Sequence, residues 1–81
     1  MDTMNNENGY NGWKNYETWN VALYIQNEED LYRIAKGCKS YGHFLARAGI
    51  MPGEKTPDGV AWYNSRISKR EVSEMIKELD S

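Results

Sequence analysis

The chain has 81 residues, enough for one small domain, and its formal net charge of −2 lacks the basic surplus of proteins that work by neutralising phosphate. Cys38 is the only cysteine, so an intrachain disulfide and a cysteine-based zinc site are excluded. The longest apolar run, residues 21–25, is too short to cross a membrane, and the first residues lack the pattern of a signal peptide. We therefore expect a cytoplasmic protein.

The first twelve residues are predicted to be a flexible tail. Residues 1–12 hold four Asn and two Gly, with Tyr10 as their only aromatic residue. This composition cannot bury enough apolar surface to offset the entropy lost on ordering. A single domain is accordingly predicted over residues 13–81.

The segment over residues 16–26 is predicted to be the first helix. Asn15 can cap its N-terminus, and Tyr16, Trp19 and Leu23 recur on one line of a helical surface. Trp19 is therefore the expected central residue of the core. Apolar residues also alternate in this segment, so a β-strand is an alternative. It is less favoured, because the Asn15 cap fits the start of a helix.

Two further short helices are predicted in the middle of the chain. Asn27 is expected to cap the first, and Gly37 to bend or end it, since Gly weakens a helix by about 1 kcal/mol relative to Ala. Ser40 can cap the second, which ends at Gly49 in a left-handed conformation. Apolar residues at helical spacing are expected in the core from both helices: Leu31, Ile34, Ala35, Cys38, Tyr41, Phe44, Leu45 and Ala48.

Three features of the sequence predict where the last helix begins. Ser68 is a natural N-cap, and Glu71 stands where its carboxylate can reach back to the Ser68 amide. Ile67 can also pack on Val72 as a hydrophobic staple.

Before this helix, residues 52–59 are predicted to form the main loop because they hold two Pro, two Gly and an Asp. Residues 60–67 are predicted to be a short extended or single-turn piece that lies across the helices. Together the elements predict an all-α fold, a small bundle of three to four helices with a disordered N-terminal tail and a short extended segment before the last helix.

The sequence does not predict an enzyme. Cys38 and His43 stand without a recognisable nucleophile motif, and the glycines of residues 53–59 do not match the spacing of a phosphate-binding loop. No spacing of His and acidic residues singles out a metal site. We therefore expect no catalytic residue, no metal and no cofactor, and a small-ligand site near His43 stays open as an alternative.

The aromatic content is high for so small a core, with three Trp, six Tyr and one Phe. Exposed Tyr and Trp are the usual anchors of protein interfaces. The alternative is that the rings fold over the helices and only their polar ends reach water. The candidate contact residues are Trp13, Tyr16, Tyr24, Tyr41, Trp62 and Tyr63.

These features favour a protein partner over nucleic acid. Basic residues alternate with aromatic ones, as in proteins that stack single-stranded bases, but twelve acidic residues share the same segments. We expect a non-enzymatic module that binds a partner protein. Binding of single-stranded nucleic acid and association into a homodimer are the alternatives.

The run from residue 15 to 23, Asn-Tyr-Glu-Thr-Trp-Asn-Val-Ala-Leu, resembles the opening of a family of small uncharacterised proteins encoded by bacteria and their viruses. Residues 56–60, Thr-Pro-Asp-Gly-Val, are similar to that family too, whereas residues 28–30 differ from the acidic pair and Gly that members often carry. The resemblance brings no activity to transfer. It implies a phage setting, in which short acidic proteins bind and block a host or defence protein.

Overall fold

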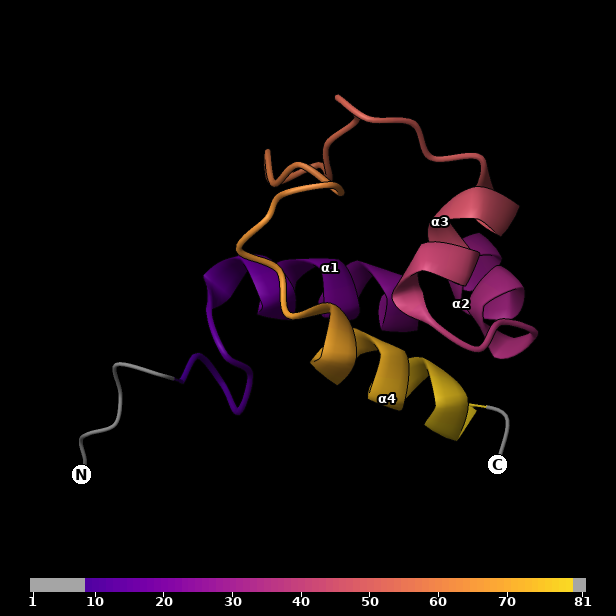
Figure 1. The fold of residues 1–81 in the computed structure, drawn as a ribbon, viewed down its shortest axis with the longest axis horizontal. Coiled ribbons are helices and arrows are strands. Elements are labelled where there is room, and N and C mark those ends of the chain that lie inside the picture. The colour runs from indigo at the N-terminus through magenta and orange to yellow at the C-terminus, as the bar shows by residue number, and fades with distance from the viewer. Residues whose placement is uncertain (1–8, 80–81) are drawn as a thin grey trace.

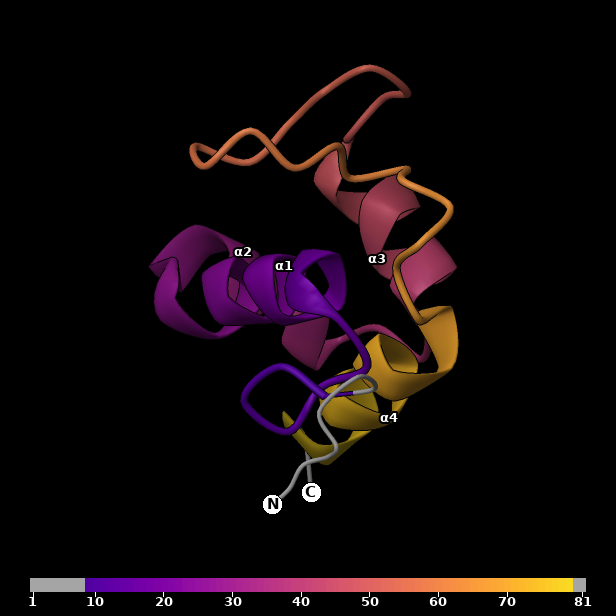
Figure 2. The same ribbon diagram turned by 90° about the vertical axis from the view of Figure 1, so that its left-hand side faces the viewer.

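The computed structural model describes residues 9–79, in which four helices are joined by short connections and one long segment (Figure 1). The helices are α1 (Tyr16–Asn27), α2 (Glu29–Lys36), α3 (Tyr41–Ala48) and α4 (Lys69–Leu79). α4 lies alongside α1, whereas α2 and α3 lie toward the C-terminal end of α1 (Figures 1 and 2). The predicted all-α fold is confirmed, and residues 9–79 contain no β pairing beyond two isolated bridges.

The core is built from buried residues of all four helices and of the segment between α3 and α4. Burying one large apolar side chain contributes roughly 1.5–3 kcal/mol, so this set supplies most of the stabilisation. The core comprises Val21, Ile25, Ala35, Cys38, Tyr41, Phe44, Leu45, Ile50, Val60, Trp62, Ile67, Val72 and Ile76. The predicted stripes of the middle helices are confirmed, because their members are buried or packed against this core.

The prediction that Trp19 is the central core residue is wrong. α1 buries Thr18, Val21, Ala22 and Ile25, which form one stripe at helical spacing, and Trp19 lies half-buried beside that stripe. Thr18 can be fully buried because its hydroxyl is satisfied within the fold. Its Oγ1 donates to Asn15 Oδ1 at 2.6 Å and accepts from Ser68 N at 2.8 Å.

The prediction that Asn27 caps the second helix is also wrong. α1 runs through Asn27, and Glu28 then turns the chain with extended backbone angles before α2 begins. The Glu28 amide is used by α1, since it donates to the Tyr24 carbonyl at 2.9 Å. Glu29 and Asp30 occupy the first turn of α2, where negative charge favours the positive end of the helix dipole.

The other helix ends in the middle of the chain follow the prediction. α2 ends at Gly37, and the Ser40 hydroxyl caps α3 by accepting from His43 N at 3.0 Å. Gly49 has a φ of 73°, in the left-handed region that favours glycine, and Ile50 N then donates to Leu45 O at 3.0 Å. This turn folds Ile50 back onto the core.

The start of α4 is confirmed in two of its three parts. Ser68 Oγ accepts from Glu71 N at 3.3 Å, and Ile67 and Val72 are both buried. The third part is wrong, because the Glu71 carboxylate accepts from Lys14 N at 2.9 Å instead of reaching the Ser68 amide. The Ser68 amide already donates to the buried Thr18 hydroxyl, so tertiary partners replace the local one.

Ser68→Ala is expected to lower the free energy of unfolding by about 1 kcal/mol, because the first turn of α4 loses its side-chain cap. Chemical denaturation followed by circular dichroism measures this loss. Ser65→Ala is the matched control, since Ser65 is exposed and precedes the helix, and it should change stability by less than about 0.5 kcal/mol. Equal stability of the two variants would show that the cap is without energetic effect.

The predicted N-terminal tail, residues 1–12, falls mostly outside the described residues, which begin at residue 9. Residues 10–13 form a tight turn. Tyr10 N donates to Trp13 O at 2.6 Å and Trp13 N to Tyr10 O at 2.9 Å, around a two-residue turn with φ values of 52° at Asn11 and 89° at Gly12. Asn-Gly is the preferred pair for such a turn because both positions need a positive φ. This turn leads the chain from Tyr10 to Trp13, just before α1.

A second tight turn organises the segment between α3 and α4. Gly59 N donates to Thr56 O at 2.8 Å and Thr56 N to Val60 O at 2.8 Å, with a φ of 89° at Gly59. Pro57 and Asp58 occupy the centre of the turn, which agrees with the predicted loop. Asn20 of α1 anchors it, since its amide accepts from Thr56 Oγ1 at 2.7 Å and donates to Asp58 Oδ2 at 2.8 Å.

The segment that follows the turn helps to bury the phenol of Tyr41. Tyr41 is 1% exposed and its hydroxyl donates to the Trp62 carbonyl at 2.6 Å. Burial, with a smaller contribution from the nearby Tyr63, raises the pKa of Tyr41 above its ordinary value of 10.0. The folded protein therefore holds the proton of Tyr41 at pH values where the unfolded chain releases it.

The free energy of unfolding is accordingly expected to fall as the pH rises above about 10, because the unfolded state then binds fewer protons than the folded one. Below that pH the contribution of Tyr41 is fully present. Urea denaturation between about pH 8 and pH 11 measures this slope. Tyr41→Phe should flatten it while lowering stability at neutral pH by about 1 kcal/mol, through loss of the hydrogen bond. An unchanged slope in Tyr41→Phe would contradict this assignment.

Candidate functional site

Two of the six candidate contact residues lie in the core. Tyr41 is 1% exposed and Trp62 is 5% exposed, and the Phe44 ring packs against both, with centroid distances of 6.4 and 6.2 Å. Their burial contradicts a role as contact residues: Tyr41 belongs to the apolar stripe of α3, and the segment before α4 turns Trp62 inward onto Phe44. A partner cannot reach either ring in the folded protein.

Two further candidates hold the segment between α3 and α4. Tyr63 is 45% exposed, and its hydroxyl donates to the Ile50 carbonyl at 2.8 Å. Tyr24 is half-buried on α1, where partial burial and then its hydrogen bond with Asp58 raise the pKa of its phenol. Both hydroxyls therefore have a structural use, although part of each ring reaches the surface.

The last two candidates, Trp13 and Tyr16, lie at the N-terminal end of α1, next to rings that the sequence did not single out. Tyr10, Tyr16 and Trp19 form an aromatic cluster, with centroid distances of 5.3, 5.0 and 5.7 Å between the three pairs of rings. Tyr10 and Tyr16 are 40% and 38% exposed. The tight turn over residues 10–13 brings Tyr10 onto α1, and the Asn11-Gly12 pair is the sequence signal that predicts such a turn.

The polar members of the same run along α1 have structural roles. Asn15 Nδ2 donates to the Arg66 carbonyl at 2.8 Å, and Glu17 forms an ion pair with Arg66 at 3.3 Å. Thr18 and Asn20 are bound to the C-terminal half of the chain, as described above. The run from Asn15 to Leu23 is therefore explained by folding except along its outer face, which carries Tyr16, Trp19 and Leu23.

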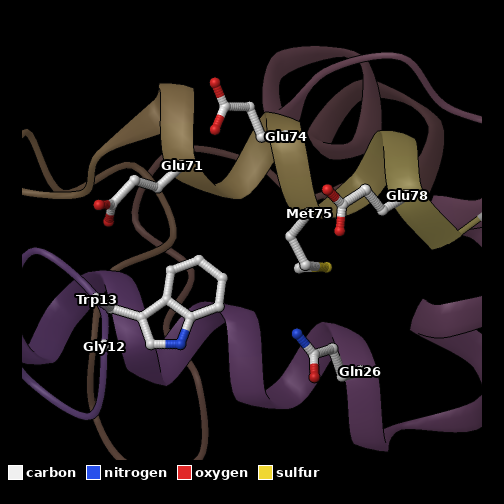
Figure 3. Close-up of a pocket in the computed structure, with 7 residues that line it drawn as sticks. All are labelled: Gly12, Trp13, Gln26, Glu71, Glu74, Met75 and Glu78. Carbon is white, nitrogen blue, oxygen red and sulfur yellow. The ribbon is translucent and has the colours of Figure 1, made fainter.

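A groove of about 440 Å³ lies beside this face, between the N-terminal turn, α1 and α4. Figure 3 shows the Trp13 indole and the Gln26 amide on one side of it and Met75 of α4 on the other. We call this the acidic groove, because its remaining side chains are carboxylates. Its lining residues are Gly12, Trp13, Gln26, Glu71, Glu74, Met75 and Glu78.

The electrostatics of the acidic groove are one-sided. None of its lining residues is basic. The Glu71 carboxylate accepts a hydrogen bond from the Lys14 amide. Glu74 forms an ion pair with Arg70 of the same helix at 3.8 Å, and both side chains are more than half exposed. Such an exposed pair is worth at most about 1 kcal/mol, so it neutralises the groove only weakly.

The aromatic cluster and the acidic groove adjoin each other along α1. Gln26 lines the groove and follows Trp19 by seven residues, which is two helical turns, so both residues lie on the same side of α1. Leu23 lies between them on that side and is half-buried. The two features therefore form one continuous surface of aromatic, apolar and acidic side chains.

The residues with chemical reactivity lie away from this surface. Cys38 is buried, its Sγ lies 3.3 Å from the Ile34 carbonyl, and burial raises the pKa of its thiol, which disfavours the nucleophilic thiolate. His43 Nδ1 accepts from Lys39 N at 3.2 Å, next to the α3 cap. Within residues 9–79, no group of three or more His, Cys, Asp or Glu is arranged to hold a metal ion.

None of the helices in the described part of the chain combines the length and the apolar character needed to cross a bilayer.

Comparison with known proteins identifies the family. A model described as a family of unknown function (DUF7249) matches residues 6–81. The chain belongs to this family. No curated protein and no solved structure matches the chain. The predicted resemblance to a family of uncharacterised proteins is therefore confirmed, and a function has to be argued from the surface described above.

Proposed function

We propose that this protein is a non-enzymatic interaction module that binds one partner protein through the surface formed by the aromatic cluster and the acidic groove. In the phage setting implied by the sequence resemblance, such a module acts as a stoichiometric inhibitor that occupies a surface of a host or defence protein in the cytoplasm. Of the six candidate contacts, Trp13 and Tyr16 belong to this surface.

The aromatic cluster is the observation that carries the proposal. Tyr10, Tyr16 and Trp19 pack on one another, yet all three stay outside the core and retain exposed ring surface. Tyrosine and tryptophan are enriched among residues that dominate binding energy, because they bury a large rigid area with little loss of conformational entropy. The neighbours of Tyr16 and Trp19 in the run along α1 serve folding, so these two rings are the part of α1 that folding leaves unexplained.

Charge argues against nucleic acid as the partner of this surface. Glu71, Glu74 and Glu78 line the adjoining groove, and phosphate groups would meet these carboxylates with no lining lysine or arginine to offset them. A protein partner with basic residues has no such conflict.

Tyr16→Ala is expected to weaken binding of the partner by about 2 kcal/mol or more, which is roughly a 30-fold rise in the dissociation constant. The partner is first captured from host extract on the immobilised full chain and then purified. Isothermal titration calorimetry with the wild-type chain and the variant gives both affinity and stoichiometry, and circular dichroism confirms that the variant is folded.

Tyr32→Ala is the matched control for this experiment. Tyr32 is 36% exposed on α2, close to the 38% of Tyr16, and does not belong to the aromatic cluster. We expect its affinity to equal that of the wild type, with one partner molecule bound per chain. Equal losses in Tyr16→Ala and Tyr32→Ala, or no loss in either, would exclude the aromatic cluster as the contact.

A further inference from the structure

The acidic groove combines features that recognise one kind of side chain. α4 contributes Glu71, Met75 and Glu78 at positions i, i+4 and i+7, so the three side chains follow one line along the helix facing the N-terminal turn. Across the groove stands the Trp13 indole, which is half-buried (Figure 3). The groove therefore presents an aromatic ring, a thioether and several carboxylates to the same space.

This combination fits a guanidinium group. Arginine stacks its planar head on an aromatic ring, attracted by the negative face of the indole, while its fixed fork of N–H donors pairs with carboxylates. Its aliphatic stem packs on apolar surface, which Met75 supplies here. A lysine ammonium has the charge but lacks the planar surface for stacking.

We infer that the acidic groove receives an arginine side chain of the partner protein. The inference rests on the proposed function and adds the chemistry of the partner, a basic segment whose arginine enters between Trp13 and α4 while the adjoining residues cover the aromatic cluster. Charge complementarity supports this occupant, because the groove is lined by three glutamates and by no basic residue.

The test uses N-acetyl-arginine amide as the ligand and N-acetyl-citrulline amide as its uncharged counterpart of nearly equal shape. Each is titrated into the full-length chain while the indole N–H signal of Trp13 is followed by NMR. The chain has three tryptophans, so that signal is assigned by its loss in Trp13→Phe. We expect a saturable shift with a dissociation constant on the order of millimolar for the arginine ligand and no shift for the citrulline ligand.

Two variants locate the site. Glu78→Gln, in the last turn of α4, should weaken arginine binding about threefold by removing one carboxylate from the groove. Glu54→Gln is the matched control, because Glu54 lies in the segment between α3 and α4 and does not line the groove, and its Gln replacement keeps an oxygen for the Met51 amide. We expect this control to bind like the wild type.

The inference is overturned if the arginine ligand gives no saturable shift, if citrulline binds equally well, or if Glu78→Gln and Glu54→Gln weaken binding by the same factor. Its failure is distinguishable from failure of the proposed function. Loss of the partner in Tyr16→Ala, together with an arginine ligand that does not bind, supports the module and rejects the arginine. Arginine binding, together with a partner whose affinity does not change in Tyr16→Ala, supports the arginine site and rejects the aromatic cluster as the contact.

Discussion

Trp62→Ala is expected to lower the free energy of unfolding by about 3–5 kcal/mol, the largest loss for any single aromatic residue in this chain. Trp62 is 5% exposed, and its indole packs on Phe44 inside a core whose other buried aromatic residue is Tyr41. Its backbone also ties the extended piece in place, since Trp62 N donates to Glu54 O at 3.0 Å and its carbonyl accepts from Tyr41. Small domains have roughly 5–15 kcal/mol of total stability, so this variant should be close to unfolding.

Urea denaturation followed by circular dichroism measures the loss, and the adjacent Tyr63→Ala is the control. Tyr63 is 45% exposed and contributes one hydrogen bond to Ile50, so its replacement should cost only about 1 kcal/mol. This contrast distinguishes a core residue from a surface residue, although the sequence predicts both neighbouring rings to be contact residues. A folded Trp62→Ala variant that loses its partner would return Trp62 to the binding surface and contradict its place in the core.

Asn20→Ala is expected to lower the free energy of unfolding by about 2–3 kcal/mol, the largest effect of a polar residue. The Asn20 side chain is fully buried and bridges α1 to the turn over residues 56–59, through the Thr56 hydroxyl and the Asp58 carboxylate. Its removal leaves the buried Thr56 hydroxyl without an acceptor and opens space beneath the turn.

The loss is measured by urea denaturation, and hydrogen exchange locates it. The amides of Gly59 and Val60, which bond to the Thr56 carbonyl and hydroxyl, should exchange faster in Asn20→Ala than in the wild type. Asn27→Ala, at the exposed end of α1, is the control and should cost less than about 0.5 kcal/mol. Comparable losses at the two asparagines would show that the buried bridge does not stabilise the turn.

The candidate site could be predicted from the sequence only in part. The excess of aromatic residues predicts exposed rings, and Trp13 and Tyr16 are among them in the described structure. Tyr10 and Trp19 were missed for opposite reasons. Tyr10 falls in a segment whose composition suggests a tail, and Trp19 has the spacing of a core residue. Their contact depends on a turn that packs the N-terminal segment onto α1.

The acidic groove could not be predicted at all. Glu74 and Glu78 have the spacing of the solvated face of an amphipathic helix, and Glu71 was predicted to belong to the helix cap. Trp13 is more than fifty residues away along the chain. Only the packing of α4 alongside α1 brings these side chains to one groove. Helical spacing shows which residues share a face of one element, but it does not show which element lies opposite.

The sequence by itself determined the helices and most of their ends, because caps, turns and apolar spacing act over a few residues. Ser40, Gly49 and Ser68 end or begin their helices as local chemistry predicts. The tertiary structure alone decided which face of α1 is buried, because that choice depends on partners far along the chain. Thr18 and Asn20 enter the interior since Ser68, Thr56 and Asp58 satisfy their hydrogen bonds. Once Thr18 faces inward with Val21 and Ile25, helical geometry turns Tyr16 and Trp19 outward, and the surface proposed for binding follows from that rotation.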